Sequence, residues 1–170
     1  MSLFEKSKKQ RYVTLAAIIA ALYTVLTLIS FAMGLDKGVI QLRLSEALAV
    51  LPAFTSAAIP GLFAGCMLSS FLTGGHPLDA LFGSLVTLLA ALLCYMMRAC
   101  ARKRAGLLLL PLPNILLNAL LIPFVLILAY GAGEAYPYMV LTVGIGELIS
   151  SGVLGVLLAI SMRKHDLLKH

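Results

Sequence analysis

The chain has 170 residues, of which 61% are hydrophobic and 12% charged, and its formal net charge is +6. A mean hydropathy of +1.03 is far above that of water-soluble domains and indicates an all-α, polytopic membrane protein. The basic residues stand in a few clusters between apolar runs, which is typical of membrane topology and not of nucleic-acid binding. The three cysteines form no CxxC pair and no cluster with histidine, so no metal site is predicted.

Six apolar runs predict six transmembrane helices, at about 12–33, 42–54, 58–73, 78–97, 108–130 and 137–162. The first run follows a basic stretch, as in a signal peptide. It exceeds the usual apolar core of about 7–15 residues, so we expect a membrane helix that is retained. The second and third runs are short and contain Pro52 and Pro60, so they form either one broken span or two short ones.

Basic clusters decide between these alternatives. Lysine and arginine gather before the first run, at 98–104 and after the last run. Such clusters mark cytoplasmic loops. The first two clusters lie on one side only if the region 42–73 crosses the membrane twice. The sequence therefore predicts one membrane domain over residues 1–170, with six helices and both termini cytoplasmic.

Polar residues within or next to the apolar runs gather in the outer half of this topology. The clearest is Glu147, near the middle of the last run, where a charge costs roughly 2.5–3.5 kcal/mol and usually marks a substrate or ion site. Short, proline-interrupted runs such as 42–54 and 58–73 also point to a binding site in a transport protein. The candidate substrate-binding residues are Gln41, Arg43, Glu46, Asp79, Asn118 and Glu147.

Structural alternatives stay open for several of these residues. Arg43 and Glu46 lie three apart on one helical face and can neutralise each other. Asp79 is also placed to cap a helix or to act as an acid in its first turn. Asn114, four residues before Asn118, fits a cap or an interhelical hydrogen bond. For Glu147 the alternative is an internal pair with Arg43.

Small residues recur one turn apart on two of the runs. Ala16 and Ala20 on the first run allow close helix approach, as do Gly61 and Gly65 on the third, where internal packing is the default expectation. No nucleotide-binding loop is present in the sequence. Active transport would therefore draw its energy from a partner or from an ion gradient.

Several segments resemble one known family. They are 41–48 (QLRLSEAL), 51–52 (LP), 59–66 (IPGLFAGC), 79–84 (DALFGS), 112–113 (LP), 118–120 (NAL) and 143–147 (VGIGE). Over about 15–158, the chain is similar to the queuosine-precursor transporter (QueT) family, the substrate-binding S components of energy-coupling factor (ECF) transporters.

The resemblance implies a multi-pass protein of the bacterial cell membrane with a ligand pocket on the outer side. It implies docking onto a coupling subunit and two ATPases, which use the ATP, so no cofactor is expected in this chain. It also implies that Ala16 and Ala20 form the face that meets the coupling subunit.

The ligand implied by the resemblance is a 7-deazaguanine, such as queuine or its aminomethyl or cyano precursors. The base presents N1–H and an exocyclic amine side by side, and one carboxylate accepts both donors. Glu46 or Glu147 suits that edge. Asn118 and Gln41 suit the carbonyl and the ring nitrogens, and Asp79 suits a cationic amine.

Two other classes of protein are alternatives to this interpretation. A stand-alone, proton-coupled small-molecule transporter with Glu147 as proton carrier is the alternative function, although the chain shows no inverted repeat and is short for that work. An enzyme is not expected, because the sequence has no HExxH or GxSxG motif and no pairing of a nucleophile with a base.

Overall fold

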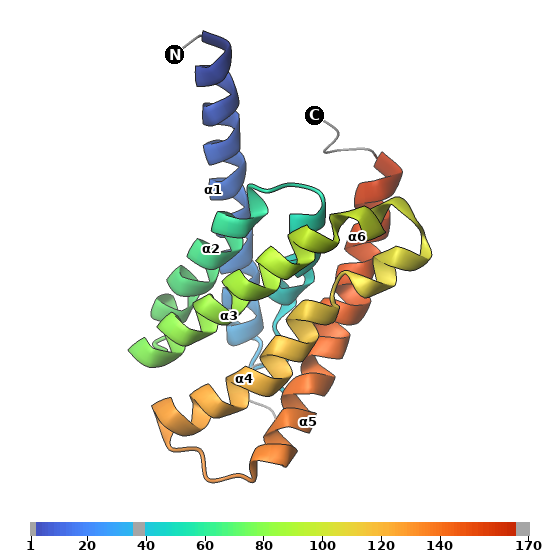
Figure 1. The fold of residues 1–170 in the computed structure, drawn as a ribbon. Coiled ribbons are helices and arrows are strands. Elements are labelled where there is room, and N and C mark those ends of the chain that lie inside the picture. The colour runs from blue at the N-terminus through green and yellow to red at the C-terminus, as the bar shows by residue number, and fades with distance from the viewer. Residues whose placement is uncertain (1–2, 36–39, 166–170) are drawn as a thin grey trace.

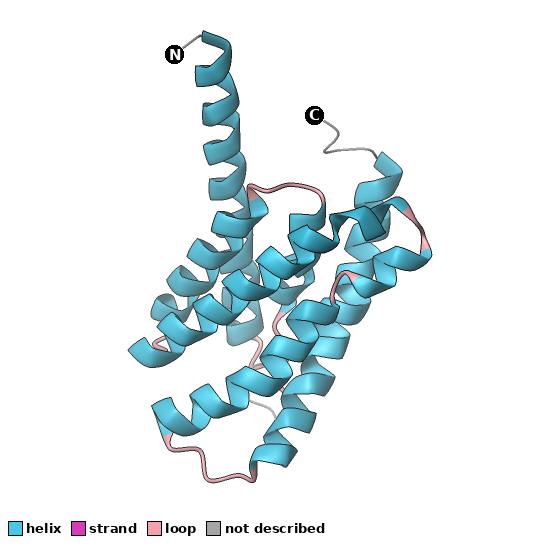
Figure 2. Cartoon of the chain, in the orientation of Figure 1, coloured by secondary structure: helices cyan, strands magenta, loops and turns pink. Residues whose placement is uncertain are grey.

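The computed structural model of the protein describes residues 3–35 and 40–165, which form helices joined by short loops and contain no strand (Figures 1 and 2). The predicted all-α class is confirmed. In chain order the elements are α1 (Leu3–Ala32), η1 (Leu44–Ala53), α2 (Ala58–Leu72), α3 (Pro77–Met96), η2 (Met97–Arg102), η3 (Ala105–Leu109), α4 (Leu112–Tyr130), α5 (Tyr136–Glu147), η4 (Leu148–Leu154) and α6 (Gly155–His165).

Four helical stretches of the described chain are long and apolar enough to cross a membrane: Glu5–Ala32, Pro77–Arg102, Ala105–Tyr130 and Tyr136–Lys164. Two shorter apolar helices, η1 and α2, occupy the second and third predicted runs. The six predicted helical segments are therefore present, and four of them have spanning length. The cytoplasmic placement of the termini stays a prediction.

The first helix begins earlier than predicted. The apolar run starts at Tyr12, whereas α1 begins at Leu3 and its first turns extend beyond the other helices (Figure 1). The added residues include glutamate, glutamine and several lysines, which are good helix formers. Helix propensity therefore extends α1 toward the N-terminus, beyond the start of the apolar run.

The element η1 is a 3₁₀-helix, not the α-helix predicted for 42–54. Ten residues at a rise of about 2.0 Å cover only about 20 Å, less than a hydrocarbon core of about 30 Å. Pro52 lies inside η1 and contributes no backbone donor. The element packs against α1, α2, α3, η4 and α6, so its backbone is enclosed by protein.

The helices α1 and α2 pack with their backbones in contact. A Cβ atom on Gly61 would lie 2.8 Å from the Ala16 oxygen, and one on Gly65 would lie 2.8 Å from the Ala20 oxygen. Glycine is therefore required at both positions for this approach. The structure thus places Ala16 and Ala20, the expected partner face, half buried against α2. The exposed small residues one turn apart on α1 are Ala17 and Ala21.

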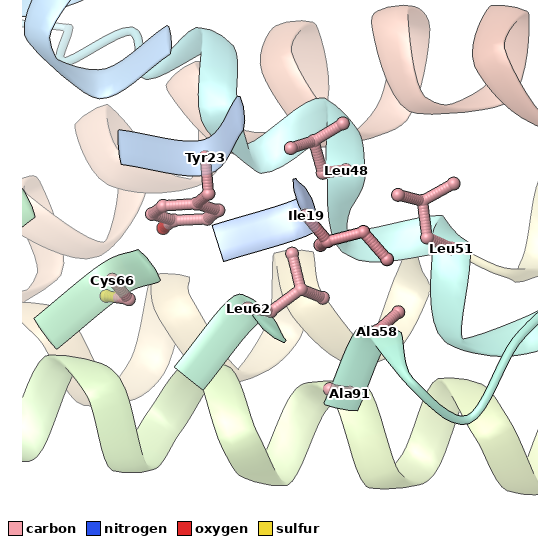
Figure 3. Close-up of a cluster of buried hydrophobic side chains, with 8 residues drawn as sticks. All are labelled: Ile19, Tyr23, Leu48, Leu51, Ala58, Leu62, Cys66 and Ala91. Carbon is pink, nitrogen blue, oxygen red and sulfur yellow. The ribbon is translucent and has the colours of Figure 1, made fainter. Parts of the chain in front are cut away.

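A hydrophobic cluster joins these helices to η1 and α3. Tyr23 and Leu62 are almost fully buried in it. Figure 3 shows its members on four elements: Ile19, Tyr23, Leu48, Leu51, Ala58, Leu62, Cys66 and Ala91. Large apolar side chains elsewhere, such as Leu116, Phe124 and Leu157, are more than half exposed. Those outward faces are suited to lipid, as expected of a membrane protein.

Candidate functional site

The site forms where the chain before η1 passes close to the last long helix. A Cβ atom on Gly146 would overlap the backbone oxygen of Gln41, and one on Gly155 would make a tight contact with η1, at 3.3 Å from the Ala47 oxygen. Residues without a side chain allow this approach. The segment that carries Glu46 therefore lies beside the helix that carries Glu147.

Two buried carboxylates are linked by one amide. The Asn114 Nδ2 group donates to Glu46 Oε2 at 3.1 Å and to Glu147 Oε2 at 2.9 Å. The Tyr23 hydroxyl donates to Glu46 Oε1 at 2.5 Å. All four side chains are buried, and α1, η1, α4 and α5 contribute one each. This chain of hydrogen bonds fixes the position of both acids at the centre of the fold.

A small cavity lies beside these acids. Its volume is about 20 Å³, whereas ligand pockets commonly measure roughly 300–1,000 Å³. In this conformation the site therefore has room for little more than a water molecule, and a larger ligand must move its walls. The lining residues are Gln41, Arg43, Glu46, Cys66, Gly83, Thr87, Asn118, Ile122, Val143 and Glu147.

Among the residues that the structure describes, Arg43 is the one cation in this lining. It stands in extended backbone just before η1 and lies within electrostatic range of Glu46, Glu147 and Asp79. Among the described residues, neither buried glutamate forms a salt bridge with Arg43, and their hydrogen bonds go to Tyr23 and Asn114 instead. The guanidinium keeps its donors available on the cavity side.

The observed hydrogen bonds leave Glu147 with a free acceptor oxygen and Asn118 with a free donor group. Both Glu46 oxygens accept a hydrogen bond, whereas the bond to Glu147 is on Oε2. Asn118 lies beside the Glu147 carboxylate, but its buried Nδ2 makes no hydrogen bond of good geometry with any described residue. A buried donor without a partner is costly. The cavity therefore offers an acceptor and a donor side by side.

The backbone changes its geometry directly after Glu147. The element η4 is a π-helix, and α5, η4 and α6 follow one another without a break from Tyr136 to His165. Within η4, the buried Ser151 Oγ forms no hydrogen bond with any residue in the described part of the chain. π-Helical turns are rare and often occur at functional sites, and this one begins directly after Glu147.

Asp79 lies in the first turn of α3 and is not among the residues that line the cavity. Its Oδ2 accepts a hydrogen bond from the Tyr130 hydroxyl at 3.2 Å, and the same hydroxyl accepts from the His76 backbone N–H at 2.8 Å. The His76 and Tyr130 rings meet edge to face. Asp79 is therefore an acid in the first turn of α3 and not its cap, which is His76, and its bond to Tyr130 ties α3 to the end of α4.

Five of the six predicted ligand residues line the cavity: Gln41, Arg43, Glu46, Asn118 and Glu147. Sequence reasoning missed Tyr23, which looks like an ordinary core residue in an apolar run. It also treated Asn114 as a cap or an interhelical bond, and only the second alternative is seen. The four-residue spacing of Asn114 and Asn118 was the available signal for their shared face.

We expect Tyr23→Phe to destabilise the fold by about 1–3 kcal/mol, because it leaves the buried Glu46 Oε1 without a donor. Thermal unfolding of the purified protein in detergent measures the loss. Tyr138→Phe is the matched control, since Tyr138 is half exposed. Equal stability of the two variants would show that the Tyr23 hydroxyl does not hold Glu46.

Comparison with known proteins gives two matches. The family model described as QueT transporter matches residues 13–164. The curated protein "Queuosine precursor transporter QueT" of Lactococcus lactis subsp. cremoris (strain MG1363) is 39% identical over 84 residues, which cover 49% of this chain and 48% of that protein. The match thus spans about half the length of the curated relative. No solved structure matches the chain.

Proposed function

The chain belongs to the QueT transporter family, and on that premise we propose that it is the substrate-binding subunit of an ECF-type importer. In this role it captures a queuosine precursor outside the cell, and partner subunits use ATP to drive its uptake. The four long apolar helices agree with a multi-pass membrane protein. The observation that carries the proposal is the pair of buried glutamates beside a cavity with unused hydrogen-bonding groups.

The polar groups of the cavity complement one edge of a 7-deazaguanine. That edge carries a carbonyl acceptor, the N1–H donor and the amine donor in a row. Glu147 accepts the two donors, and Asn118 Nδ2, which lacks a partner, donates to the carbonyl. Charge-assisted hydrogen bonds of this kind are roughly twice as strong as neutral ones.

The two glutamates have different parts in this proposal. Glu46 is held on both oxygens by Tyr23 and Asn114, so it positions Asn114, which in turn orients Glu147. Gln41 and Arg43, from the segment before η1, line the same cavity and are proposed to meet the remaining polar atoms of the ligand. Asp79 lies outside the lining and accepts a hydrogen bond from Tyr130, and it is proposed to meet a cationic amine of the ligand.

The cavity must widen before a deazaguanine fits, since its volume is about 20 Å³. Widening exposes Glu147 and Asn118 together, so a ligand that satisfies both groups stabilises the open form. Ligands without the matching groups leave them unpaired, which gives specificity.

The coupling subunit is proposed to dock on the exposed face of α1. Because Ala16 and Ala20 already contact α2 through their backbones, the exposed pair Ala17 and Ala21 is the better candidate for close approach. We expect Ala17→Leu with Ala21→Leu to abolish uptake into proteoliposomes that contain the coupling subunit and both ATPases, without changing ligand affinity. Ala64→Leu, an exposed alanine of α2, is the control and should leave uptake intact.

The same proteoliposomes test the function itself. Labelled queuine should accumulate only when the chain, the partner subunits and internal ATP are all present. Accumulation by the chain alone under a proton gradient would contradict the ECF role and favour a proton-coupled transporter with Glu147 as carrier.

A further inference from the structure

A second polar depression lies where the end of η1 meets α1 and the end of α3, and it shares no lining residue with the cavity beside Glu147. It consists of two adjoining cavities of about 270 and 400 Å³ that share Ala53 and Arg98. Arg11 of α1 lines the first cavity, and Arg102 of η2 lines the second. Both cavities are much larger than the one beside Glu147.

Three arginines converge on this depression, and no described acidic residue lines either cavity. Arg98 stacks on the Tyr95 ring at 4.4 Å and donates one bond to the Tyr95 backbone oxygen. Its other donors remain for a ligand, because a guanidinium has five. Two or more guanidiniums around one space favour a phosphate group, which they bind in bidentate fashion.

The depression continues onto an apolar surface. Met96 lines the second cavity beside Arg98 and Arg102 and is 73% exposed. Leu92 and Leu89, one and two turns earlier on α3, are also exposed. A ligand placed here would meet guanidinium groups at one end and a lipid-facing helix at the other. A free phosphate ion would use only the first of these contacts.

We propose that this depression binds the phosphodiester headgroup of an anionic phospholipid, with an acyl chain along the Met96 side of α3. Basic pockets between membrane helices at the cytoplasmic surface suit such headgroups, and the arginines here belong to the clusters predicted to be cytoplasmic. The proposal does not depend on which ligand the cavity beside Glu147 takes, since the two sites have different linings.

Native mass spectrometry of the full chain tests the proposal, with equal amounts of phosphatidylglycerol and phosphatidylcholine in the detergent. The wild type should retain phosphatidylglycerol in preference to phosphatidylcholine. The double variant Arg98→Gln, Arg102→Gln should lower that preference by on the order of tenfold or more. The double variant Arg163→Gln, Lys164→Gln, which removes two exposed charges of α6, should keep it.

A second measurement separates the lipid from other sources of phosphate. Phosphatidylglycerol should raise the unfolding temperature of the wild type and not that of the Arg98→Gln, Arg102→Gln variant. Three results would overturn the proposal: unchanged lipid preference in that variant, equal retention of both lipids by the wild type, or displacement of the lipid by millimolar inorganic phosphate.

Discussion

Glu147→Gln should weaken the binding of 7-deazaguanine ligands by about 100-fold or more. The glutamine side chain can still accept the Asn114 hydrogen bond at the position of Glu147 Oε2. It then turns its NH₂ group toward the ligand, so that donors face donors. Loss of a charge-assisted bond and one unpaired ligand donor together cost about 3 kcal/mol, which corresponds to roughly two orders of magnitude in Kd.

The control is Glu134→Gln, which removes an exposed carboxylate from the loop between α4 and α5. Titration calorimetry with each purified variant measures the effect, after circular dichroism has verified that both are folded. Tight binding by the Glu147→Gln variant would remove Glu147 from ligand recognition. Glu46 would then be the remaining buried carboxylate in the cavity lining.

Gly146→Ala should both destabilise the fold and weaken ligand binding. The added Cβ atom would overlap the backbone oxygen of Gln41, which cannot move as a flexible side chain would. Overpacking of this kind costs typically about 1–3 kcal/mol. The displaced segment carries Gln41 and Arg43, both of which line the cavity, so the ligand site changes with it.

Gly144→Ala is the matched control, two residues away on the same helix. Its Cβ atom would meet only the Ala119 Cβ, at an ordinary distance of 3.5 Å. Alanine is favoured over glycine within a helix by about 0.5–1 kcal/mol, so this variant should be as stable as the wild type or more so. If both variants unfold at the same temperature and bind equally, the contact between Gly146 and Gln41 is not required.

Sequence reasoning located much of the site because burial of charge in a membrane is so costly. Because of that cost, the position of Glu147 within an apolar run predicted a site residue. Gln41, Arg43 and Asn118 were predicted with it, since they are polar residues in or next to the apolar runs. The structure brings these four residues to one cavity. Such an argument depends on composition and position alone, and a single sequence supplies both.

The partners of the acids depend on tertiary contacts that have no local signal. Tyr23 meets Glu46 across 23 residues, and Asn114 meets the same carboxylate across 68. A tyrosine within an apolar helix looks the same whether its hydroxyl bonds a lipid headgroup or a buried acid. The sequence therefore could not predict that Glu46 is hydrogen-bonded on both oxygens and positions Asn114.

The two departures from α-helical backbone geometry, in η1 and η4, were also not predictable from the sequence. The pattern of 42–54 is apolar and gave no reason to expect a 3₁₀-helix, which arises where η1 is enclosed by other helices. The π-helix after Glu147 has no propensity signature. Both elements adjoin the acids, in agreement with the general rule that local structural rules fail most often at functional sites.

Recognition of a queuosine precursor by the cavity beside Glu147 is tested most directly by isothermal titration of the purified protein with queuine, the two 7-deazaguanine precursors, guanine and riboflavin. We expect saturable binding of the deazaguanines and none of riboflavin. If the folded protein binds none of the deazaguanines, the proposed recognition of a queuosine precursor is wrong. The two buried glutamates would then bind another ligand or serve helix packing.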